Sequence, residues 1–390
     1  MSRPPIYLFQ EFEVDWILGT LGTSPRAGKP EDDSLGEPNT SQSVGNEIVS
    51  LLQVPARSAR VRTFLIILGL TVAVIVTGYH SSPWPSALVI RVIFEAGGRA
   101  ANAALAKHVP PNITARLNER YDQADPDAFL DVYYPSGIEG TSRSLPTIVW
   151  VHGGGFVSGS KDHIANYLKI LAGKGYTVVG VDYSLAPRRT YPIPLRQLNA
   201  ALAHLAKHAQ ALHVDASRIV LAGDSAGAHI SAQIANIITS PEYAKAIGIV
   251  PALGPSQLAA TILYCGPYDV GVFKVDGALG WFMTTVLWSY SGSRDHTTNK
   301  AFALASVSHY VTSKFPPTFI SAGNSDPLLP HSVAMADALA KEGVRVDRLF
   351  FAPEHTPSLP HEYQFNLDSD AGQLALARSL EFLSSIVAAR

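Results

Sequence analysis

Strands and helices are predicted to alternate along the last two thirds of the chain, and this alternation limits the folds available to it. Short apolar runs rich in β-branched residues predict strands at 128–134, 147–152, 176–183, 218–222, 259–265, 318–322 and 346–351. Helical spacing of apolar residues predicts helices at 161–173, 194–211, 225–239, 330–342 and 371–389. Strands separated by helices build a mostly parallel sheet that helices cover on both faces. We therefore predict an α/β fold with such a sheet in residues 128–390.

A Gly-Asp-Ser-Ala-Gly motif occupies the turn between one predicted strand and the next helix. Its serine, Ser225, stands at the first position of the helix predicted at 225–239. A serine flanked by small residues at a strand-to-helix turn is typical of a nucleophile elbow, in which the tight backbone exposes the hydroxyl. The amide of Ala226 then stands at a helix N-terminus, where it can bind an anion. The motif predicts that Ser225 is a catalytic nucleophile.

Three consecutive glycines lie in the segment His152–Phe156, directly after a predicted strand. Glycines let backbone amides approach a ligand because no side chain intervenes. Upstream of a nucleophile elbow, such a loop supplies the amides of an oxyanion hole. We assign this hole to the amides of Gly154, Gly155 and Ala226. A phosphate cradle is the alternative, but no lysine–serine or lysine–threonine pair follows the glycines as a P-loop requires.

A nucleophilic serine needs a base, and the base needs an acid that orients it. With this fold the acid follows the serine in the chain and the base comes last. Asp326, just past a predicted strand, is the favoured acid, and Asp269, which also follows a strand, is the alternative. His361 is the favoured base because it lies between the last strand and the last helix. His355 in the same loop is the alternative, whereas His331 follows the acid too closely in sequence.

Several motifs together resemble the hormone-sensitive lipase family of α/β-hydrolases: HGGGF at 152–156, YSLAP at 183–187, GDSAG at 223–227, DPL at 326–328 and HEYQF at 361–365. The resemblance extends over residues 128–390. It implies an α/β-hydrolase fold, hydrolysis of carboxylic esters, no cofactor and no metal. It also implies a helical cap, formed by N-terminal helices and an insertion after the sixth strand. Arg188 and Arg196 stand where family members usually carry acidic residues, which affects local ion pairing rather than the triad.

The expected activity is that of a serine carboxylesterase, which would hydrolyse short- to medium-chain esters through an acyl-enzyme. An amidase, a peptidase or an acyltransferase would use the same triad and stays an alternative. A non-catalytic ligand-binding member of the family is a further alternative. It would be marked by the loss of a triad residue, and no triad residue is missing from this sequence.

Two apolar segments are predicted to form the cap. One is the run 88–94 in the linker region 81–127, where Gly97 and Gly98 are expected to interrupt a helix. The other lies in the insertion at 271–300 and contains Trp281 and Phe282. With Phe156, these aromatic residues are expected to close an apolar pocket that accepts about four to eight acyl carbons. The alternative is that the two segments simply bury each other as ordinary core.

A charge-free run at 64–79 predicts a transmembrane helix over residues 63–80. A helix of this length spans roughly 25 Å, somewhat less than a hydrocarbon core of about 30 Å. Arg57, Arg60 and Arg62 precede the run, which places the N-terminal segment 1–62 in the cytoplasm and the catalytic domain outside. A late signal peptide, giving a secreted or periplasmic protein, and a buried core helix are the alternatives.

The composition excludes other classes of protein. The chain has 30 basic and 32 acidic residues among 390, so its net charge of −2 gives no reason to expect nucleic acid as a partner. Only 16% of residues are charged and 47% are apolar, which indicates a large buried sheet, a membrane segment, or both. The single cysteine, Cys265, excludes an internal disulfide and a cysteine-based zinc cluster. Residues 20–46, rich in glycine, serine and proline, predict a flexible linker, with an ordered loop as the alternative.

Overall fold

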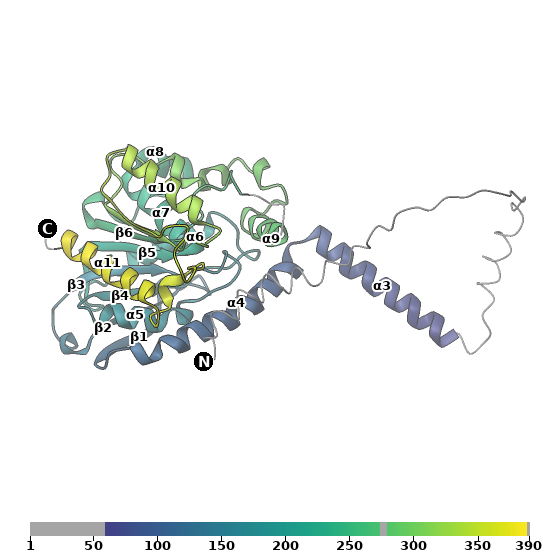
Figure 1. Cartoon of the computed structure of the whole chain (residues 1–390), viewed down its shortest axis with the longest axis horizontal. Helices are drawn as coiled ribbons and strands as arrows, with labels where there is room; N and C mark the ends of the chain where they lie inside the picture. Colours follow the sequence, from purple (N-terminus) through teal and green to yellow (C-terminus); the bar gives the residue numbers. More distant parts are fainter. Residues whose placement is uncertain (1–58, 274–278, 388–390) are drawn as a thin grey trace, which may run out of the picture.

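An eight-stranded sheet runs through the centre of the catalytic region, with strand order β1-β2-β4-β3-β5-β6-β7-β8 (Figure 1). The computed structural model describes residues 59–273 and 279–387, so the predicted linker at 20–46 lies outside the described residues. All neighbouring strands are parallel except β2, which runs antiparallel to both β1 and β4. The strands are β1 Ile113–Arg120, β2 Phe129–Pro135, β3 Leu145–Val151, β4 Thr177–Val181, β5 Val214–Asp224, β6 Leu258–Tyr264, β7 Thr318–Ala322 and β8 Val346–Phe350.

Helices cover both faces of this sheet, as predicted. Helices α6, α7 and α10 pack on one face, and α5 and α11 pack on the other (Figure 1). The α-helices are α3 Ala59–Ser81, α4 Trp84–Leu105, α5 Ala165–Ala172, α6 Ile193–Lys207, α7 Ser225–Thr239, α8 Pro241–Ile247, α9 Gly280–Ser291, α10 Leu329–Lys341 and α11 Asp370–Val387. The mostly parallel sheet with helices on both faces confirms the predicted fold class.

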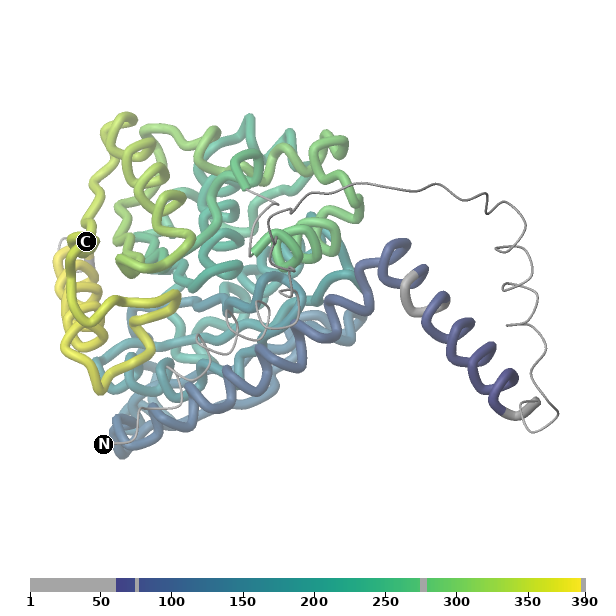
Figure 2. The backbone as a smooth tube through the Cα atoms, turned by 45° about the vertical axis from the view of Figure 1, so that its right-hand side comes forward, coloured from purple at the N-terminus to yellow at the C-terminus, as the bar shows by residue number. Residues whose placement is uncertain are grey.

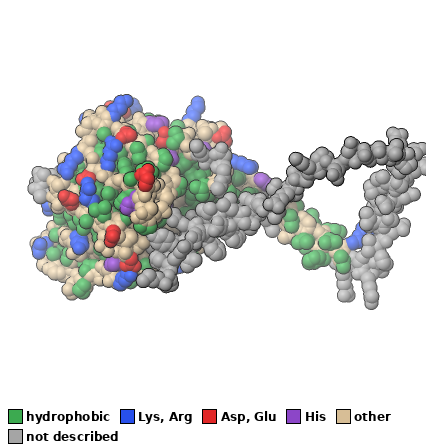
Figure 3. Space-filling model, viewed as in Figure 1, with side chains coloured by type: hydrophobic (Ala, Val, Ile, Leu, Met, Phe, Trp, Pro, Cys, Tyr) green, Lys and Arg blue, Asp and Glu red, His purple; other side chains and the backbone are tan. Residues whose placement is uncertain are grey.

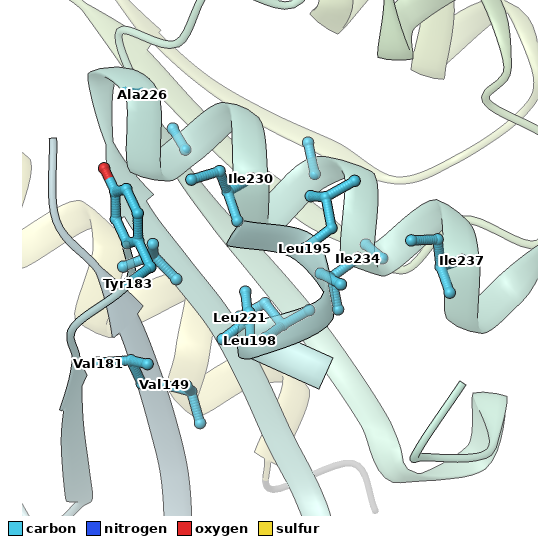
Figure 4. Packing of buried hydrophobic residues seen from close by; sticks show 14 of the residues in the cluster. Val149, Val181, Tyr183, Leu195, Leu198, Leu221, Ala226, Ile230, Ile234 and Ile237 are labelled. Carbon is cyan, nitrogen blue, oxygen red and sulfur yellow. The ribbon is translucent and has the colours of Figure 1, made fainter. Parts of the chain in front are cut away.

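The core lies between the sheet and its helices because strand residues alternate between the two faces. On one face, Val149 of β3 and Leu221 of β5 pack near Leu195 of α6 and Ile230 of α7 (Figure 4). On the other face, the ring of Trp150 meets aromatic residues of α5 and β6. The central strands are buried on both sides, so their apolar runs are continuous rather than alternating.

The sheet begins earlier in the chain than predicted, with β1 inside the region assigned to linker helices. This edge strand pairs only with β2, and its central residues are exposed. It is rich in polar residues, as exposed edge strands commonly are, and it therefore lacks the apolar run that marked the other strands.

Helix α4 also differs from the prediction, because it continues through Gly97 and Gly98 without a break. A β-carbon on Gly98 would come within 2.8 Å of the ring of His163. The glycine therefore permits close packing of α4 against the 3₁₀ turn Lys161–His163 instead of ending the helix.

Helix α3 contains the predicted membrane segment and leaves the domain at the start of α4 (Figure 2). Its stretch Val61–Ser81 is long and apolar enough to cross a membrane, and none of it is buried by the rest of the chain. Hydrophobic side chains cover the described part of α3 in Figure 3. The lack of burial rules out the buried core helix, and a membrane span and a signal sequence both fit the same length and composition.

Candidate active site

The nucleophile elbow forms because β5 ends at Asp224 and α7 begins at the next residue, Ser225. The backbone of Ser225 is in the left-handed region, with φ of +50°. The flanking glycines are required by close contacts. A β-carbon on Gly223 would lie 2.6 Å from the backbone of Gly227, and one on Gly227 would lie 2.0 Å from the carbonyl oxygen of Val151. The tight turn therefore explains the small residues of the motif.

The three residues predicted as a triad are joined by hydrogen bonds. His361 Nε2 lies 3.0 Å from Ser225 Oγ, and His361 Nδ1 lies 2.9 Å from Asp326 Oδ2. The Asp326 side chain is fully buried, and its Oδ1 accepts a hydrogen bond of 2.7 Å from the amide of Leu328. This is the arrangement in which a histidine removes the serine proton while a carboxylate orients the ring.

The alternative acid and base lie elsewhere. Asp269 pairs with His309 at 2.8 Å and accepts a hydrogen bond from the Ser306 hydroxyl. The His355 ring packs against Phe351, with 4.8 Å between ring centroids. Neither of them contacts Ser225. The structure therefore brings together the favoured set of residues and not the alternatives.

The electrostatics of His361 favour its charged form. Burial is the largest single effect and lowers the pKa of His361, but the Asp326 carboxylate and the neighbouring Cys265 raise it through charge and hydrogen bonding, and together they leave this pKa well above its usual value. The carboxylate that orients the ring therefore also strengthens it as a proton acceptor.

The glycine loop after β3 lies directly over the elbow. A β-carbon on Gly153 would be 3.1 Å from the Ser225 β-carbon, so the loop and the serine are in close contact. Gly154 and Gly155 have φ of +108° and +59°, which favours glycine at both positions. Among the described residues neither amide donates a hydrogen bond to protein, and the Ala226 amide lies in the first turn of α7, where no helical acceptor is available.

Asp224 holds this loop in place, a role that the sequence analysis missed. Its Oδ2 accepts a 2.8 Å hydrogen bond from the Gly153 amide, and its Oδ1 accepts a 2.7 Å bond from Trp150 Nε1. Burial, together with the nearby Glu362 carboxylate, raises the pKa of Asp224 well above its usual value. The only signal in the sequence was the position of this acid between the strand and Ser225.

The space beside Gly155 is walled by two distant helices. A methyl group on Gly155 would lie 3.3 Å from Val286 and 3.7 Å from Phe282 of α9, and 4.0 Å from Phe94 of α4. The rings of Phe94 and Phe282 are 5.7 Å apart, so the two helices meet at this point. Phe94 belongs to the predicted cap segment 88–94, but the sequence analysis did not assign it to the pocket.

The other two residues assigned to the pocket lie further back. Phe156 is buried and stacks on Tyr290 of α9, with 3.8 Å between ring centroids. Trp281 is half-buried against the hydrophobic core. Of the two predicted pocket residues on α9, Phe282 is therefore the one whose ring lies beside Gly155.

One group of side chains in the described residues is compact enough to share a metal ion. Cys265, Asp326 and His361 place their ligand atoms within 4.8 Å of one another. Burial raises the pKa of the Cys265 thiol to about 11, although the neighbouring His361 opposes this shift. Asp326 and His361 of this group are also hydrogen-bonded in the series with Ser225, so the group is part of the candidate triad.

The two arginines that depart from the family pattern lie outside the triad. Arg188 forms an ion pair with Asp127, which also accepts a hydrogen bond from the Ser184 hydroxyl. Arg196 donates to the carbonyl of Gly248 at 3.2 Å. Both arginines are therefore engaged in contacts that do not involve Ser225, Asp326 or His361.

Comparison with known proteins agrees with this fold. A family model described as the alpha/beta hydrolase fold matches residues 148–357, more than half of the chain. The chain belongs to this α/β-hydrolase family. A carboxylesterase, NlhH, from Mycobacterium tuberculosis is 30% identical to this hydrolase over 293 residues, covering 70% of this chain and 84% of the relative. An esterase from Gibberella moniliformis is 31% identical over 206 residues, covering 52% of this chain and 63% of the relative. The hydrolase thus matches less than two thirds of that fungal esterase.

Solved structures show the same fold. Esterase B from Lactobacillus rhamnosis superposes with a TM-score of 0.64 at 23% identity, covering 77% of this hydrolase and 97% of that chain. An esterase from Pyrobaculum calidifontis gives a TM-score of 0.61 at 21% identity, covering 77% and 93%. At these identities the likeness is one of fold. It includes most of the described hydrolase and confirms the predicted α/β-hydrolase architecture.

Proposed function

We propose that this protein is a serine carboxylesterase that cleaves carboxylic esters through an acyl-enzyme. The observation that carries the proposal is the hydrogen-bonded series Ser225–His361–Asp326, which lies beside glycine-loop amides that donate to no other described residue. The fungal relative is an esterase by name, and the mycobacterial relative is a carboxylesterase by name. No metal or cofactor is needed, because the protein groups supply the nucleophile, the base and the anion-binding donors.

The reaction follows from the positions of the three side chains. Ser225 Oγ attacks the ester carbonyl while His361 Nε2, 3.0 Å away, takes its proton. Asp326 stabilises the resulting imidazolium, which then donates its proton to the leaving alcohol. Water attacks the acyl-serine in the second half of the reaction, with His361 again acting as the base, and releases the carboxylic acid.

The negative oxygen of each tetrahedral intermediate binds the amides of Gly154, Gly155 and Ala226. These donors are rigid because the loop is tied to Asp224 on one side and Ala226 belongs to α7 on the other. Losing one such donor typically reduces the rate by about 10²–10³-fold. In this proposal helices α4 and α9 act as the cap, and the rings of Phe94 and Phe282 beside Gly155 limit the acyl group to short or medium chains.

The membrane arrangement is part of the proposal. Helix α3 would anchor the protein through residues 63–80, with segment 1–62 in the cytoplasm and the catalytic domain outside. The unburied apolar surface of α3 and the arginines before it support this orientation. The catalytic domain carries its own core, so cleavage of the segment as a signal peptide would release a folded hydrolase. Detecting the mature N-terminus of the expressed protein distinguishes the two outcomes.

The direct test is the replacement Ser225→Ala. Esterase activity should fall by at least about 10⁴-fold, and labelling by a fluorophosphonate probe should disappear. The matched control is Ser384→Ala, which changes a serine whose hydroxyl only bonds a carbonyl in α11. Unchanged circular dichroism would show that both variants fold. Retained activity or labelling in the Ser225→Ala protein would refute the assignment, and product analysis with added alcohol or amine would reveal acyl transfer.

A further inference from the structure

A row of large apolar side chains on the first half of α4 remains exposed to solvent. Each is between 40% and 69% exposed, and together they form what we name the outer face of α4: Trp84, Leu88, Val89 and Val92. Their spacing places them on one side of the helix. The opposite side is buried against the catalytic domain through Ala87 and Ile90. The helix is therefore apolar on both sides, and only one of these sides is covered.

Such a cluster differs from the rest of the described surface after residue 82. The other large apolar side chains exposed there are scattered over separate segments: Leu117, Val250, Val272, Leu279 and Leu374. Single exposed apolar residues are common on soluble proteins, whereas a continuous apolar face indicates a binding surface. The outer face of α4 therefore needs an occupant.

With α3 as the membrane anchor proposed above, the position of α4 in the chain points to a lipid bilayer as the occupant. Helix α3 ends at Ser81 and α4 begins at Trp84, so the outer face starts where the candidate membrane span stops. Val92 is eight residues beyond Trp84, or about 12 Å along the helix. Amphipathic helices in this position lie in the interface, with their apolar side buried about 5–10 Å below the headgroups.

The charges of the segment agree with a bilayer. Residues 63–94 contain no lysine and no acidic residue, and Arg91 is their only arginine. Arg91 turns toward the catalytic domain, where Nε donates to the carbonyl of Val157 at 2.7 Å and Nη2 donates to that of Ala186 at 3.1 Å. The outer face is thus left without a charge from Trp84 to Val92, so insertion of these side chains carries no charge-desolvation penalty. The ion pair Glu95–Arg99, 3.8 Å apart on the following turns of α4, marks where the uncharged face ends.

A second contact ties the cap to the end of α3. Arg294, just after α9, donates from Nη1 to the carbonyl of His80 at 2.8 Å, and its guanidinium lies 5.4 Å from the centre of the Trp288 ring. The start of α4 and the end of α9 therefore both lie close to the last residues of the candidate membrane span. The cap rather than the opposite end of the sheet faces the membrane.

We propose that the outer face of α4 docks into the bilayer in which α3 is anchored, and that the enzyme takes its ester substrates from that bilayer. The second half of the proposal rests on the esterase function proposed above. It follows because α4 also carries Phe94, which lies beside Gly155 at the proposed oxyanion hole. The substrate class is therefore hydrophobic esters with short or medium acyl chains and an alcohol part that dissolves in membranes.

Docking is tested independently of catalysis by a nitroxide attached to the full chain in phosphatidylcholine vesicles. Val92→Cys provides the label site, with Val250→Cys as the matched control, because Val250 is exposed on another segment and the native Cys265 is buried. Dissolved oxygen should reach the Val92 label. The accessibility of this label to a water-soluble nickel complex should be at least fivefold lower than that of the Val250 label. Equal exposure to the nickel complex would overturn docking. Shielding from both reagents would also overturn it, by showing a protein partner or a second copy on this face.

Substrate uptake is tested with two esters and the same vesicles. Leu88→Asp combined with Val92→Asp should lower kcat/KM at least tenfold for hexadecyl butyrate dissolved in the vesicles, and change it less than twofold for water-soluble p-nitrophenyl acetate. The control pair Leu117→Asp and Val250→Asp should leave both values unchanged. Equal effects on the two esters, or no effect on either, would overturn uptake from the bilayer. If the unmodified protein hydrolyses neither ester, the esterase proposal fails, while the nitroxide result still decides docking.

Discussion

The two central glycines of the loop over Ser225 should respond very differently to alanine, although they are neighbours. At Gly155, φ of +59° lies in the left-handed region, where a side chain costs about 1–2 kcal/mol. The new methyl group would be 3.3 Å from Val286 and would meet only side chains. We expect Gly155→Ala to fold, to lose about 1–2 kcal/mol of unfolding free energy, and to keep its amide in place.

At Gly154 the methyl group would meet backbone. It would lie 2.2 Å from the carbonyl oxygen of Ser158, and φ of +108° is outside the left-handed region that other residues adopt. The turn in which the amides of Val157 and Ser158 bond the Gly154 carbonyl must therefore open. Breaking two hydrogen bonds of about 1 kcal/mol each and adding backbone strain of about 1–3 kcal/mol should lower the free energy of unfolding of Gly154→Ala by roughly 3–5 kcal/mol. Displacement of the oxyanion donors should also lower kcat about 10²–10³-fold.

The assay combines urea unfolding with kcat for p-nitrophenyl acetate, hexanoate and octanoate. Gly155→Ala should lose less than tenfold in kcat on acetate and progressively more on the longer esters, because its methyl group occupies space that faces Phe282 and Val286. Gly154→Ala should be impaired about equally on all three. A Gly154→Ala protein with native kcat, beside a Gly155→Ala protein that is inactive on acetate, would refute the assignment of this loop to the oxyanion hole.

Three further predictions concern the base, its pKa and the cap. His361→Ala should reduce the esterase rate to near background while His355→Ala keeps most of it; the reverse result in a steady-state assay would identify His355 as the base. Because Asp326 holds the pKa of His361 above its usual value, the base becomes protonated and activity falls as pH decreases through that raised pKa. Asp326→Asn should therefore shift the acid limb of the kcat/KM profile to lower pH and lower the maximal rate about 10⁴-fold, and an unmoved limb would contradict the assigned cause. Phe282→Ala, and more weakly Trp281→Ala, should move the preferred acyl length above about eight carbons; efficient hydrolysis of emulsified long-chain triglyceride by the unmodified protein would oppose a closed pocket.

Much of the fold could be predicted from local pattern. Helix α7 and strand β7 occupy 225–239 and 318–322, the ranges expected from sequence. Their apolar periodicity and their turn residues depend only on neighbours in the chain, so no tertiary information was needed. The nucleophile elbow and the glycine loop could likewise be predicted from the sequence, because consecutive small residues at the end of a strand have few other structural roles. Strand β1 was not predicted because its exposed edge position permits polar residues. The helix break expected at Gly97 and Gly98 was wrong, because Gly98 permits close packing against His163 and does not end the helix.

The sequence by itself determined the chemistry of the site: a serine on a tight turn, glycine amides before it, and an acid and a histidine after it in the right order. It could not determine how close they lie, because Ser225 and His361 are 136 positions apart and only the sheet brings them within 3.0 Å. The tertiary structure alone decided that Asp224 ties down the glycine loop and that Phe94 meets Phe282. Such contacts join segments that are far apart in the chain, and the local sequence of one segment carries no information about the other. They depend on how loops and helices pack over the sheet.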